Sequence, residues 1–284
     1  MGRGTRTAAL VAAALAGTVA LTGCGSDRER PSFIGEGIPT DGGEQDEEGT
    51  GGDGDEDTPA GGGNGVTDLP PTEMVSSAMD AVTGADSLRL SGTIEESPGQ
   101  LMEIDMLMDV RGDCAGTVAV AGEGSFELLK RGNELWYQPD TEFWQAVTGS
   151  DMTELSGMYL YGTTDNPDAE AMAEMCDLEG FLGNFGDVSG MTSDEVSVGE
   201  ESTHLNVPVI ALHEVPKPGS SRESTLLIAT EGEPYLMHME QTERGTTNAI
   251  SMSDFDVPVD FDEPAAHLVL DLEELANGGA PGGF

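Results

Sequence analysis

Hydrophobic and polar residues alternate most regularly between Met102 and Val110. Every second position of this segment is apolar: Met102, Ile104, Met106, Met108 and Val110. Charged residues stand between them at Glu103, Asp105 and Asp109. A period of two is typical of a strand with one buried face, and a helix does not produce it. The segment therefore predicts a β-strand that buries its methionine-bearing face.

A different period precedes this strand. The apolar residues after Pro71 recur at helical spacing, at Met74, Val75, Ala78, Met79 and Val82. Pro71 and Thr72 are typical of a helix start, and Gly84 is typical of a helix end. We therefore predict a helix from Pro71 to Gly84, with one apolar side.

Most of the remaining pattern predicts strands joined by short turns. Strand-like segments lie at 88–94, 118–120, 125–130, 134–138, 196–212, 225–229, 235–242 and 248–255. Helical spacing returns at 152–185, and residues 268–275 form a short closing helix or strand. Because consecutive strands with short turns pair antiparallel, this order predicts an α+β domain with a large antiparallel sheet and its helices on one side.

The first 23 residues have the layout of a secretory signal peptide. Arg3 and Arg6 precede an apolar run from Ala8 to Leu21, which is too short for a typical membrane-spanning helix. The residues before Cys24 match the lipobox of bacterial lipoproteins. This match predicts cleavage after Gly23 and attachment of diacylglycerol to Cys24, which would hold the protein on the extracytoplasmic face of the cell membrane. The alternative is an ordinary secreted protein with a cysteine in its signal peptide.

Composition divides the rest of the chain. Residues 24–70 are rich in Gly, Asp, Glu, Thr and Pro and contain few large apolar residues, so we predict a disordered acidic linker. Residues 71–276 are long enough for one domain with a sizeable core. The glycine-rich end, 277–284, is predicted to be a disordered tail.

The charge of the chain excludes some functions. It has 54 acidic residues against 11 Lys and Arg, a formal net charge of −43. The few basic residues are dispersed and cannot form the patch that nucleic acid requires. Anionic lipid headgroups would also be repelled, so contact with the membrane is expected through the lipid on Cys24. Two explanations of the acidity stay open, namely a salty habitat and solubility beside a charged cell wall.

Two cysteines remain once Cys24 is assigned to lipid. Cys114 and Cys176 form a natural pair in an oxidising compartment, so we predict a disulfide bond between them. The alternative is two independent buried thiols. No Cys-x-x-Cys pair is present, which argues against a redox or zinc site.

Catalytic signatures are absent from the sequence. It contains no G-x-S-x-G elbow, no phosphate-binding glycine loop with a lysine, and no H-E-x-x-H helix. The four histidines, His204, His213, His238 and His267, are scattered, and each is interpreted as a strand or loop residue. We therefore expect no enzyme activity, no cofactor and no metal.

Several motifs together resemble the LolA/LppX-like lipoproteins of actinobacteria. They are the lipobox at Cys24, the strand at Leu88–Thr93, the turn at Gly112–Val118, the aromatic hairpin at Leu135–Trp144, and the segments Pro234–Glu240 and Ile250–Val259. The resemblance implies a strongly curved antiparallel half-barrel with helices over its concave side. It also implies an apolar interior that holds acyl chains or the lipid group of a partner.

Methionine adds to this expectation, because it is pliable and suits surfaces that accept apolar partners of varied shape. We expect a monomeric carrier or holder of lipidic or acylated ligands. The residues predicted to line its interior are Leu88, Leu90, Ile104, Met106, Met108, Trp136, Met237 and Met239. The alternative is a non-catalytic interaction module with a filled core that docks another envelope protein. A large apolar cavity would favour the carrier, and a packed interior would favour the module.

Overall fold

Twelve strands and a few short helices follow one another in the computed structural model, which describes residues 63–97, 99–150, 152–183, 195–215 and 219–276. The predicted signal peptide, most of the predicted linker and the predicted tail lie outside these ranges. The strands are β1 (Ser87–Ser97), β2 (Gln100–Asp109), β3 (Cys114–Val120), β4 (Gly124–Arg131), β5 (Glu134–Pro139), β6 (Tyr159–Thr163), β7 (Val196–His204), β8 (Val207–Glu214), β9 (Arg222–Ala229), β10 (Leu236–Glu243), β11 (Thr246–Ser253) and β12 (Val269–Asp271). The α-helices are α1 (Pro71–Gly84), α2 (Thr141–Thr148), α3 (Pro167–Ala173), α4 (Leu178–Gly183) and α6 (Leu272–Ala276).

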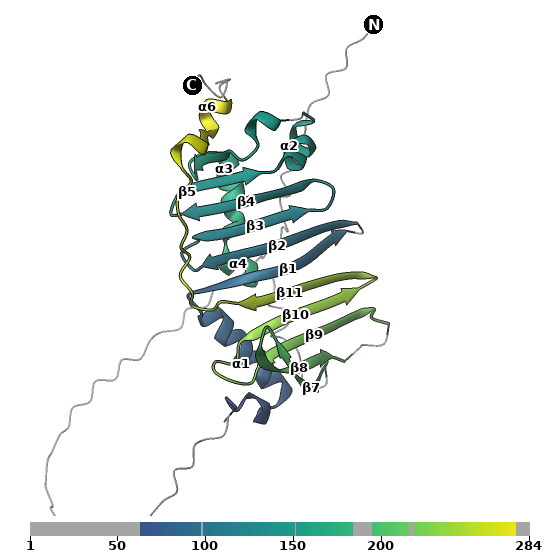
Figure 1. Ribbon diagram of the computed structural model, residues 1–284. Coiled ribbons are helices and arrows are strands. Elements are labelled where there is room, and N and C mark those ends of the chain that lie inside the picture. The colour runs from purple at the N-terminus through teal and green to yellow at the C-terminus, as the bar shows by residue number, and fades with distance from the viewer. Residues whose placement is uncertain (1–62, 98, 151, 184–194, 216–218, 277–284) are drawn as a thin grey trace, which may run out of the picture. The chain divides into compact units, whose positions relative to one another are not determined.

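All twelve strands form one sheet, in the order β12-β6-β5-β4-β3-β2-β1-β11-β10-β9-β8-β7 (Figure 1). β1 lies at its middle, because it pairs with β2 on one side and with β11 on the other. The sheet stays open, with β7 and β12 at its two edges. The predicted α+β fold with a curved open sheet is thereby confirmed. One detail differs, since β12 pairs with β6 in parallel.

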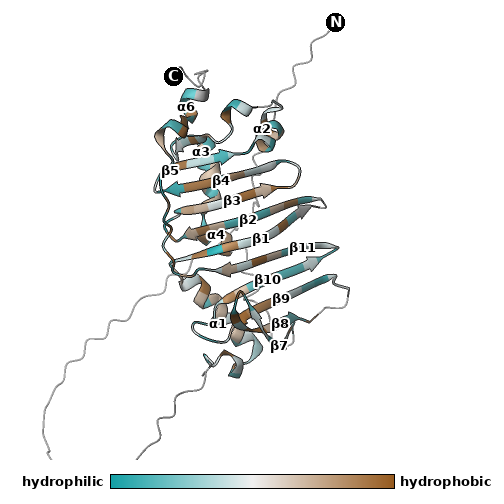
Figure 2. Cartoon of the chain, viewed as in Figure 1, coloured by the Kyte–Doolittle hydropathy of each residue, from teal (hydrophilic) through white to brown (hydrophobic). Residues whose placement is uncertain are grey.

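The sheet has two faces of different character. Leu88 and Leu90 of β1 lie opposite Met108 and Met106 of β2, and all four side chains are fully buried. We call the face that bears them the inner face. The main hydrophobic core lies here, between the sheet and the residues of α1 and α4. Figure 2 shows the expected alternation of hydrophobic and hydrophilic positions along the strands.

Helix α1 begins and ends where the sequence predicts. Pro71 occupies its first turn, where a missing N–H costs nothing, and its buried side is made of Met74, Val75, Ala78, Met79 and Val82. These side chains pack on the inner face beside β9 and β10. Helix α1 therefore closes one end of the core.

The folded domain begins earlier than Pro71, so the predicted linker boundary is wrong. Val66 lies in a short 3-10 helix, Val66–Asp68, and is almost fully buried in the main core. The Asn64 backbone N–H donates to the Thr230 carbonyl at 2.8 Å, and the Asn64 side-chain amide donates to the Ala229 carbonyl at 3.0 Å. One apolar residue and one amide thus fix a segment whose composition alone predicts disorder.

The region predicted to be helical between 152 and 185 contains a strand. Tyr159–Thr163 forms β6, which pairs with Glu134–Tyr137 of β5. Helix α3 follows, with the Asn166 side chain accepting from the backbone N–H groups of Asp168 and Ala169. A five-residue strand among helical turns was missed because its partner strand, and not its own pattern, stabilises it.

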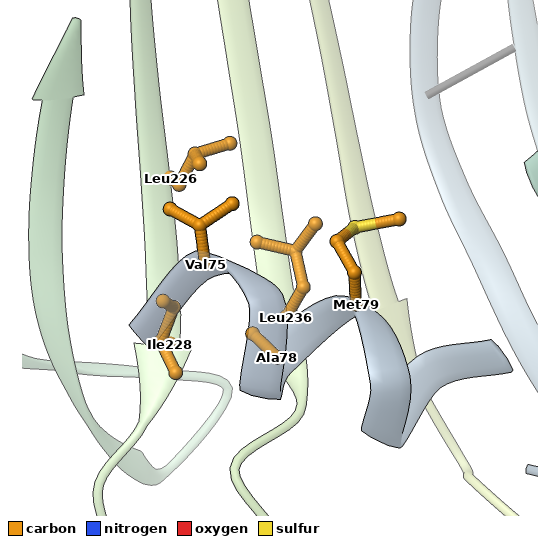
Figure 3. Close-up of a pocket in the computed structure, with 6 residues that line it drawn as sticks. All are labelled: Val75, Ala78, Met79, Leu226, Ile228 and Leu236. Atoms are coloured by element: carbon orange, nitrogen blue, oxygen red, sulfur yellow. The ribbon is translucent and has the colours of Figure 1, made fainter. Parts of the chain in front are cut away.

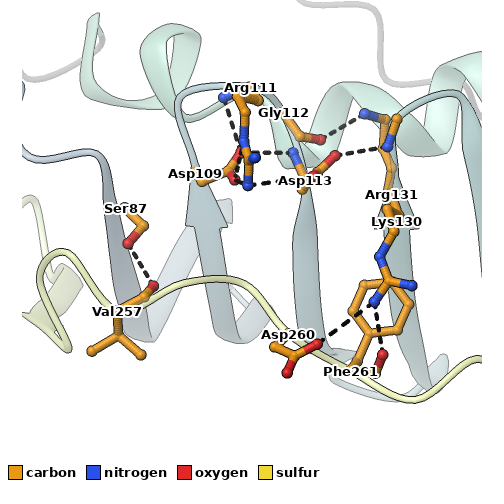
Figure 4. Close-up of polar contacts among 11 residues, drawn as sticks. Ser87, Asp109, Arg111, Gly112, Asp113, Lys130, Arg131, Val257, Asp260 and Phe261 are labelled. Carbon is orange, nitrogen blue, oxygen red and sulfur yellow. Dashed lines mark hydrogen bonds and ion pairs between the residues drawn. The ribbon is translucent and has the colours of Figure 1, made fainter.

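The other face of the sheet, the outer face, is partly covered by an extended stretch of chain. We call residues 254–265 the crossing segment, because they lead from β11 at the middle of the sheet to β12 at its edge (Figure 1). The Ser87 hydroxyl donates to the Val257 carbonyl at 2.6 Å, and Arg131 donates to the Phe261 carbonyl at 2.7 Å (Figure 4). These bonds attach the segment to β1 at the middle of the sheet and to β4 nearer the β12 edge.

Candidate functional site

The strongest candidate for a ligand site is the apolar layer between α1 and the inner face. Its sheet side continues from β1 and β2 into β11, where Ile250 and Met252 are also buried. On the far side, β9 and β10 contribute Leu226, Ile228 and Leu236. The layer is therefore a continuous apolar surface that runs across several strands and is covered by helices.

A small hollow remains under α1 (Figure 3). About 150 Å³ of space lies between the atoms there, and none of it can hold a water molecule. All its lining residues are apolar: Val75, Ala78, Met79, Leu226, Ile228 and Leu236. Drug-sized ligands occupy pockets of roughly 300–1,000 Å³, so this hollow is too small for an acyl chain as it stands. The interior is closed here, with a packing gap at the helix.

The structure brings together six of the eight residues predicted to line the interior: five are buried in the main core, and Met239 packs against it. Leu88, Leu90, Ile104, Met106 and Met108 all lie on the inner face in the main core. Their assignment to a lipid site stays a prediction, because the same burial is what a packed core requires.

Trp136 lies on the other side of the sheet. Leu135 points into the main core, so strand alternation directs Trp136 to the outer face. There its ring lies 5.5 Å from that of Tyr161 and 6.2 Å from that of Phe261 in the crossing segment. Trp136 therefore does not share a site with the five inner residues.

Met237 and Met239 do not share one face either. The pairing of β10 with β9 shifts between Leu236 and His238, which is an irregularity of the β-bulge type. Met239 packs against the main core, whereas Met237 lies in a separate cluster with Val209 and Ala229. A strand alternation read from sequence places both on one side, because it cannot register the extra residue of a bulge.

The residues around the hollow were only partly visible in the sequence. The apolar stripe of α1 predicted a buried helix face, but it gave no sign of which strands lie under it. Leu226, Ile228 and Leu236 are ordinary strand positions. No signal in the sequence marks them as neighbours of Val75 and Ala78.

The predicted disulfide is present. The sulfurs of Cys114 and Cys176 are 2.03 Å apart, and both residues are fully buried. Cys114 begins β3, and Cys176 lies in a 3-10 turn, Glu174–Cys176, between α3 and α4. The bond therefore ties these two helices to the inner face of the sheet.

A polar network surrounds the β2–β3 turn next to this bond (Figure 4). The buried Asp109 carboxylate accepts from the backbone N–H groups of Arg111 and Asp113 and from the Arg111 guanidinium. Lys130, also buried, donates from Nζ to the Gly112 carbonyl at 2.6 Å. Since these groups satisfy one another, the network is explained as a turn stabiliser and offers no free cation for an anionic ligand.

A second hollow, with about 310 Å³ of space that water can enter, opens between the ends of β2–β4 and the start of α2. Its carboxylates are Glu103, Asp140 and Glu142. Asp140 caps α2: it accepts from the Phe143 N–H and from both the N–H and the hydroxyl of Ser125. Burial acts to raise the pKa of Asp140, and these hydrogen bonds outweigh it and lower that pKa. This hollow is polar and shallow, which does not suit an apolar ligand.

Other kinds of site were also considered. The described ranges contain no group of three or more His, Cys, Asp or Glu side chains arranged to hold a metal ion. None of the helices within these ranges has the length and hydrophobicity needed to span a bilayer.

No family model matches the chain, and no curated protein is significantly similar to it. Similar solved structures exist. The lipoprotein LppX of Mycobacterium tuberculosis is 15% identical, with a TM-score of 0.42 over 67% of this chain and 97% of LppX. LprF of Mycobacterium bovis is also 15% identical, with a TM-score of 0.48 over 69% of this chain and 97% of LprF.

MucB, in complexes with MucA, is another similar structure. The Pseudomonas aeruginosa complex gives 9% identity and a TM-score of 0.31 over 70% of this chain and 59% of the matched chain. At such identities a likeness concerns the fold alone.

Proposed function

We propose that this chain is a non-catalytic, membrane-anchored lipoprotein of the cell envelope that binds lipidic or acylated ligands between α1 and the inner face of its sheet. The location rests on the signal peptide and lipobox that end at Cys24. The binding role rests on one observation. An entirely apolar, incompletely filled hollow lies under a single helix, Pro71–Gly84, on a chain whose net charge is −43.

Ligand entry requires α1 to move, because the hollow has no room even for a water molecule. Four large side chains of the helix, Met74, Val75, Met79 and Val82, are buried against the sheet. Exposing them costs roughly 1.5–3 kcal/mol each, or about 6–12 kcal/mol in all. An acyl chain of about 15 methylene groups gains roughly 12 kcal/mol when it is buried, at ~0.8 kcal/mol per group. The two terms are similar, so a long chain can replace the contacts of α1 and a short one cannot.

The lining also indicates what kind of ligand is bound. None of the six residues around the hollow carries a charge or a hydrogen-bonding side chain. Affinity should therefore rise with tail length and depend little on the headgroup. Phosphate groups are disfavoured further, because the chain from residue 71 onward has 41 acidic residues and only 7 Lys and Arg.

Native mass spectrometry of the mature chain with Cys24 replaced by Ser tests this function. We expect added fatty acids of increasing length to bind with increasing occupancy. Ala78→Leu places extra carbon atoms in the hollow and should lower that occupancy, whereas Ser76→Leu, on the exposed side of the same helix, should not. A chain that binds no lipid at any length, or binds it equally in both variants, contradicts the proposed site.

The closed interior itself favours a second candidate function. A core that excludes even water in its hollow is also what a filled interaction module would have. In that case the chain docks another envelope protein and needs no lipid. The thermal midpoint of the delipidated chain separates the two, because a true ligand raises the midpoint with the logarithm of its concentration above Kd, and a module shows no such rise.

A further inference from the structure

Two of the four histidines, scattered in the sequence, meet on the outer face. His204 ends β7 and His238 lies in β10. His204 Nε2 is 3.1 Å from the Ser251 hydroxyl oxygen, and His238 Nδ1 is 3.0 Å from the same atom. The centres of the two imidazole rings are 4.9 Å apart. One serine of β11 therefore bridges two imidazoles from distant strands.

This contact fixes the position of the β7–β8 hairpin. In the sheet, β8 and β9 separate β7 from β10 and β11. His204 can reach His238 and Ser251 only because the end of the hairpin bends over the outer face. The hairpin turn is Leu205-Asn206, and both residues have positive φ, 48° and 66°. Leucine is unfavourable in this conformation, so the turn depends on contacts such as that of His204 to hold its place.

An apolar cluster lies on the face that the hairpin covers. Its buried members are Val209 of the hairpin itself, Ala229 of β9 and Met237 of β10. Tyr235 and Phe255 pack against it, with their rings stacked at 3.7 Å between centres and 3° between planes. Movement of the hairpin would remove Val209 from this cluster and expose Met237.

The bridge is compatible with neutral imidazoles and disfavours charged ones. A serine hydroxyl can donate to one neutral imidazole and accept from the other, which satisfies the hydroxyl and the two ring nitrogens that face it. Protonation of both rings would place two positive charges about 5 Å apart in a partly buried place. Burial lowers the pKa of His204, and burial together with His204 lowers that of His238, while Glu240 on the same strand acts in the opposite direction.

We propose that the β7–β8 hairpin is a pH-sensitive cover over the cluster of Val209, Ala229 and Met237, held by the His204–Ser251–His238 bridge. The bridge keeps the hairpin closed at neutral pH, and acidification releases it. The device lies on the face of the sheet opposite the hollow under α1. A test of the hairpin cover is therefore independent of whether the chain binds lipid.

Hydrogen exchange of the mature chain, with Cys24 replaced by Ser, tests the cover. Protection factors, corrected for the intrinsic pH dependence of exchange, are compared between about pH 8 and pH 5, where histidine is the side chain that changes charge. We expect the protection of residues 202–210 to fall about tenfold or more, the size of one pKa unit. Residues 102–108 of the sheet centre should change little over the same range. Equal protection of 202–210 at both pH values contradicts the proposal.

Substitutions show whether the two histidines are the cause. His204→Gln, and His204→Gln with His238→Gln, keep a hydrogen-bonding group but cannot be charged, so the hairpin should remain protected at the lower pH. His267→Gln removes an exposed histidine elsewhere and should retain the wild-type response. If the Gln variants lose protection on acidification as the wild type does, the bridge is not the switch. The single variant changes only the hairpin tip, so a folding failure of the double variant does not remove the test.

Discussion

The guanidinium of Arg131 lies over the ring of Phe261, with 4.3 Å between its central carbon and the ring centre. Its Nη2 also donates to the Phe261 backbone carbonyl at 2.7 Å (Figure 4). One side chain at the end of β4 thus holds the crossing segment by a cation–π contact and a charge-assisted hydrogen bond. Trp136 is buried beneath that segment.

Removal of this contact should loosen the crossing segment. We expect Arg131→Ala to lower the free energy of unfolding by about 2 kcal/mol, from the lost cation–π contact and hydrogen bond together. The free energy of unfolding of Arg131→Lys should lie between those of the wild type and Arg131→Ala, because lysine keeps the charge but not the planar group. Urea titration followed by tryptophan fluorescence measures both. Arg244→Ala, at an exposed turn, is the control and should stay within about 0.5 kcal/mol of wild type.

The disulfide should contribute several kcal/mol to the stability of the fold. It joins residues 62 positions apart, and the chain-entropy model gives about 4 kcal/mol for a loop of that size. The variant Cys114→Ser, Cys176→Ser should lose stability of this order in urea titration, whereas Cys24→Ser should lose none. The prediction is wrong if reductant leaves the thermal midpoint of the wild type unchanged.

All four tyrosines should ionise at a higher pH than free tyrosine, because the pKa of each is raised. Burial is the first cause in each case and raises the pKa of Tyr137 and Tyr159 to about 12, and the carboxylates bonded to Tyr159, Tyr161 and Tyr235 act in the same direction. The native state favours the neutral phenol, so the unfolded chain ionises its tyrosines first as the pH rises. The stabilisation is therefore fully present below pH 10 and is lost as the pH rises from 10 towards 12. Ultraviolet titration of tyrosinate should be less than half complete at pH 10 in native protein and half complete in urea. Coincident curves would contradict this.

Truncation of a side chain on the inner face should lower the free energy of unfolding far more than truncation of a side chain in the turn after β2. Met106 is fully buried between β1 and β3, so Met106→Ala should cost about 2–5 kcal/mol. Val110 continues the same alternation but is 61% exposed, and Val110→Ala should be nearly neutral. Similar losses in the two variants would mean that Met106 lines a space already open to solvent.

Periodicity was a good guide where one regular pattern continued through a whole element. The alternation from Met102 to Met108 predicted both β2 and its buried face, and the spacing from Met74 to Val82 predicted α1 with its ends. These patterns succeed because burial of one side of a regular element repeats at that element's own period. The pairing of Cys114 with Cys176 followed equally well, because chemistry leaves few alternatives for two cysteines in an oxidising compartment.

Short or irregular segments could not be predicted from their own sequence, because contacts with neighbouring elements determine their structure. β6 is held by β5, residues 63–66 are held by Thr230 and Ala229, and the bulge in β10 divides Met237 from Met239. None of these effects leaves a repeating pattern. Composition therefore placed the domain boundary too late, and alternation placed Trp136 and Met237 with residues that they do not touch.

The sequence by itself determined the class of fold, the central strands, the first helix and the cysteine pair, because each depends on local periodicity or on the chemistry of one residue type. Only the tertiary structure decided that the interior closes under α1, that Phe261 lies over Trp136, and that His204 reaches His238. Such contacts join residues far apart in the chain, and their geometry depends on sheet order and strand bending, which no single segment encodes.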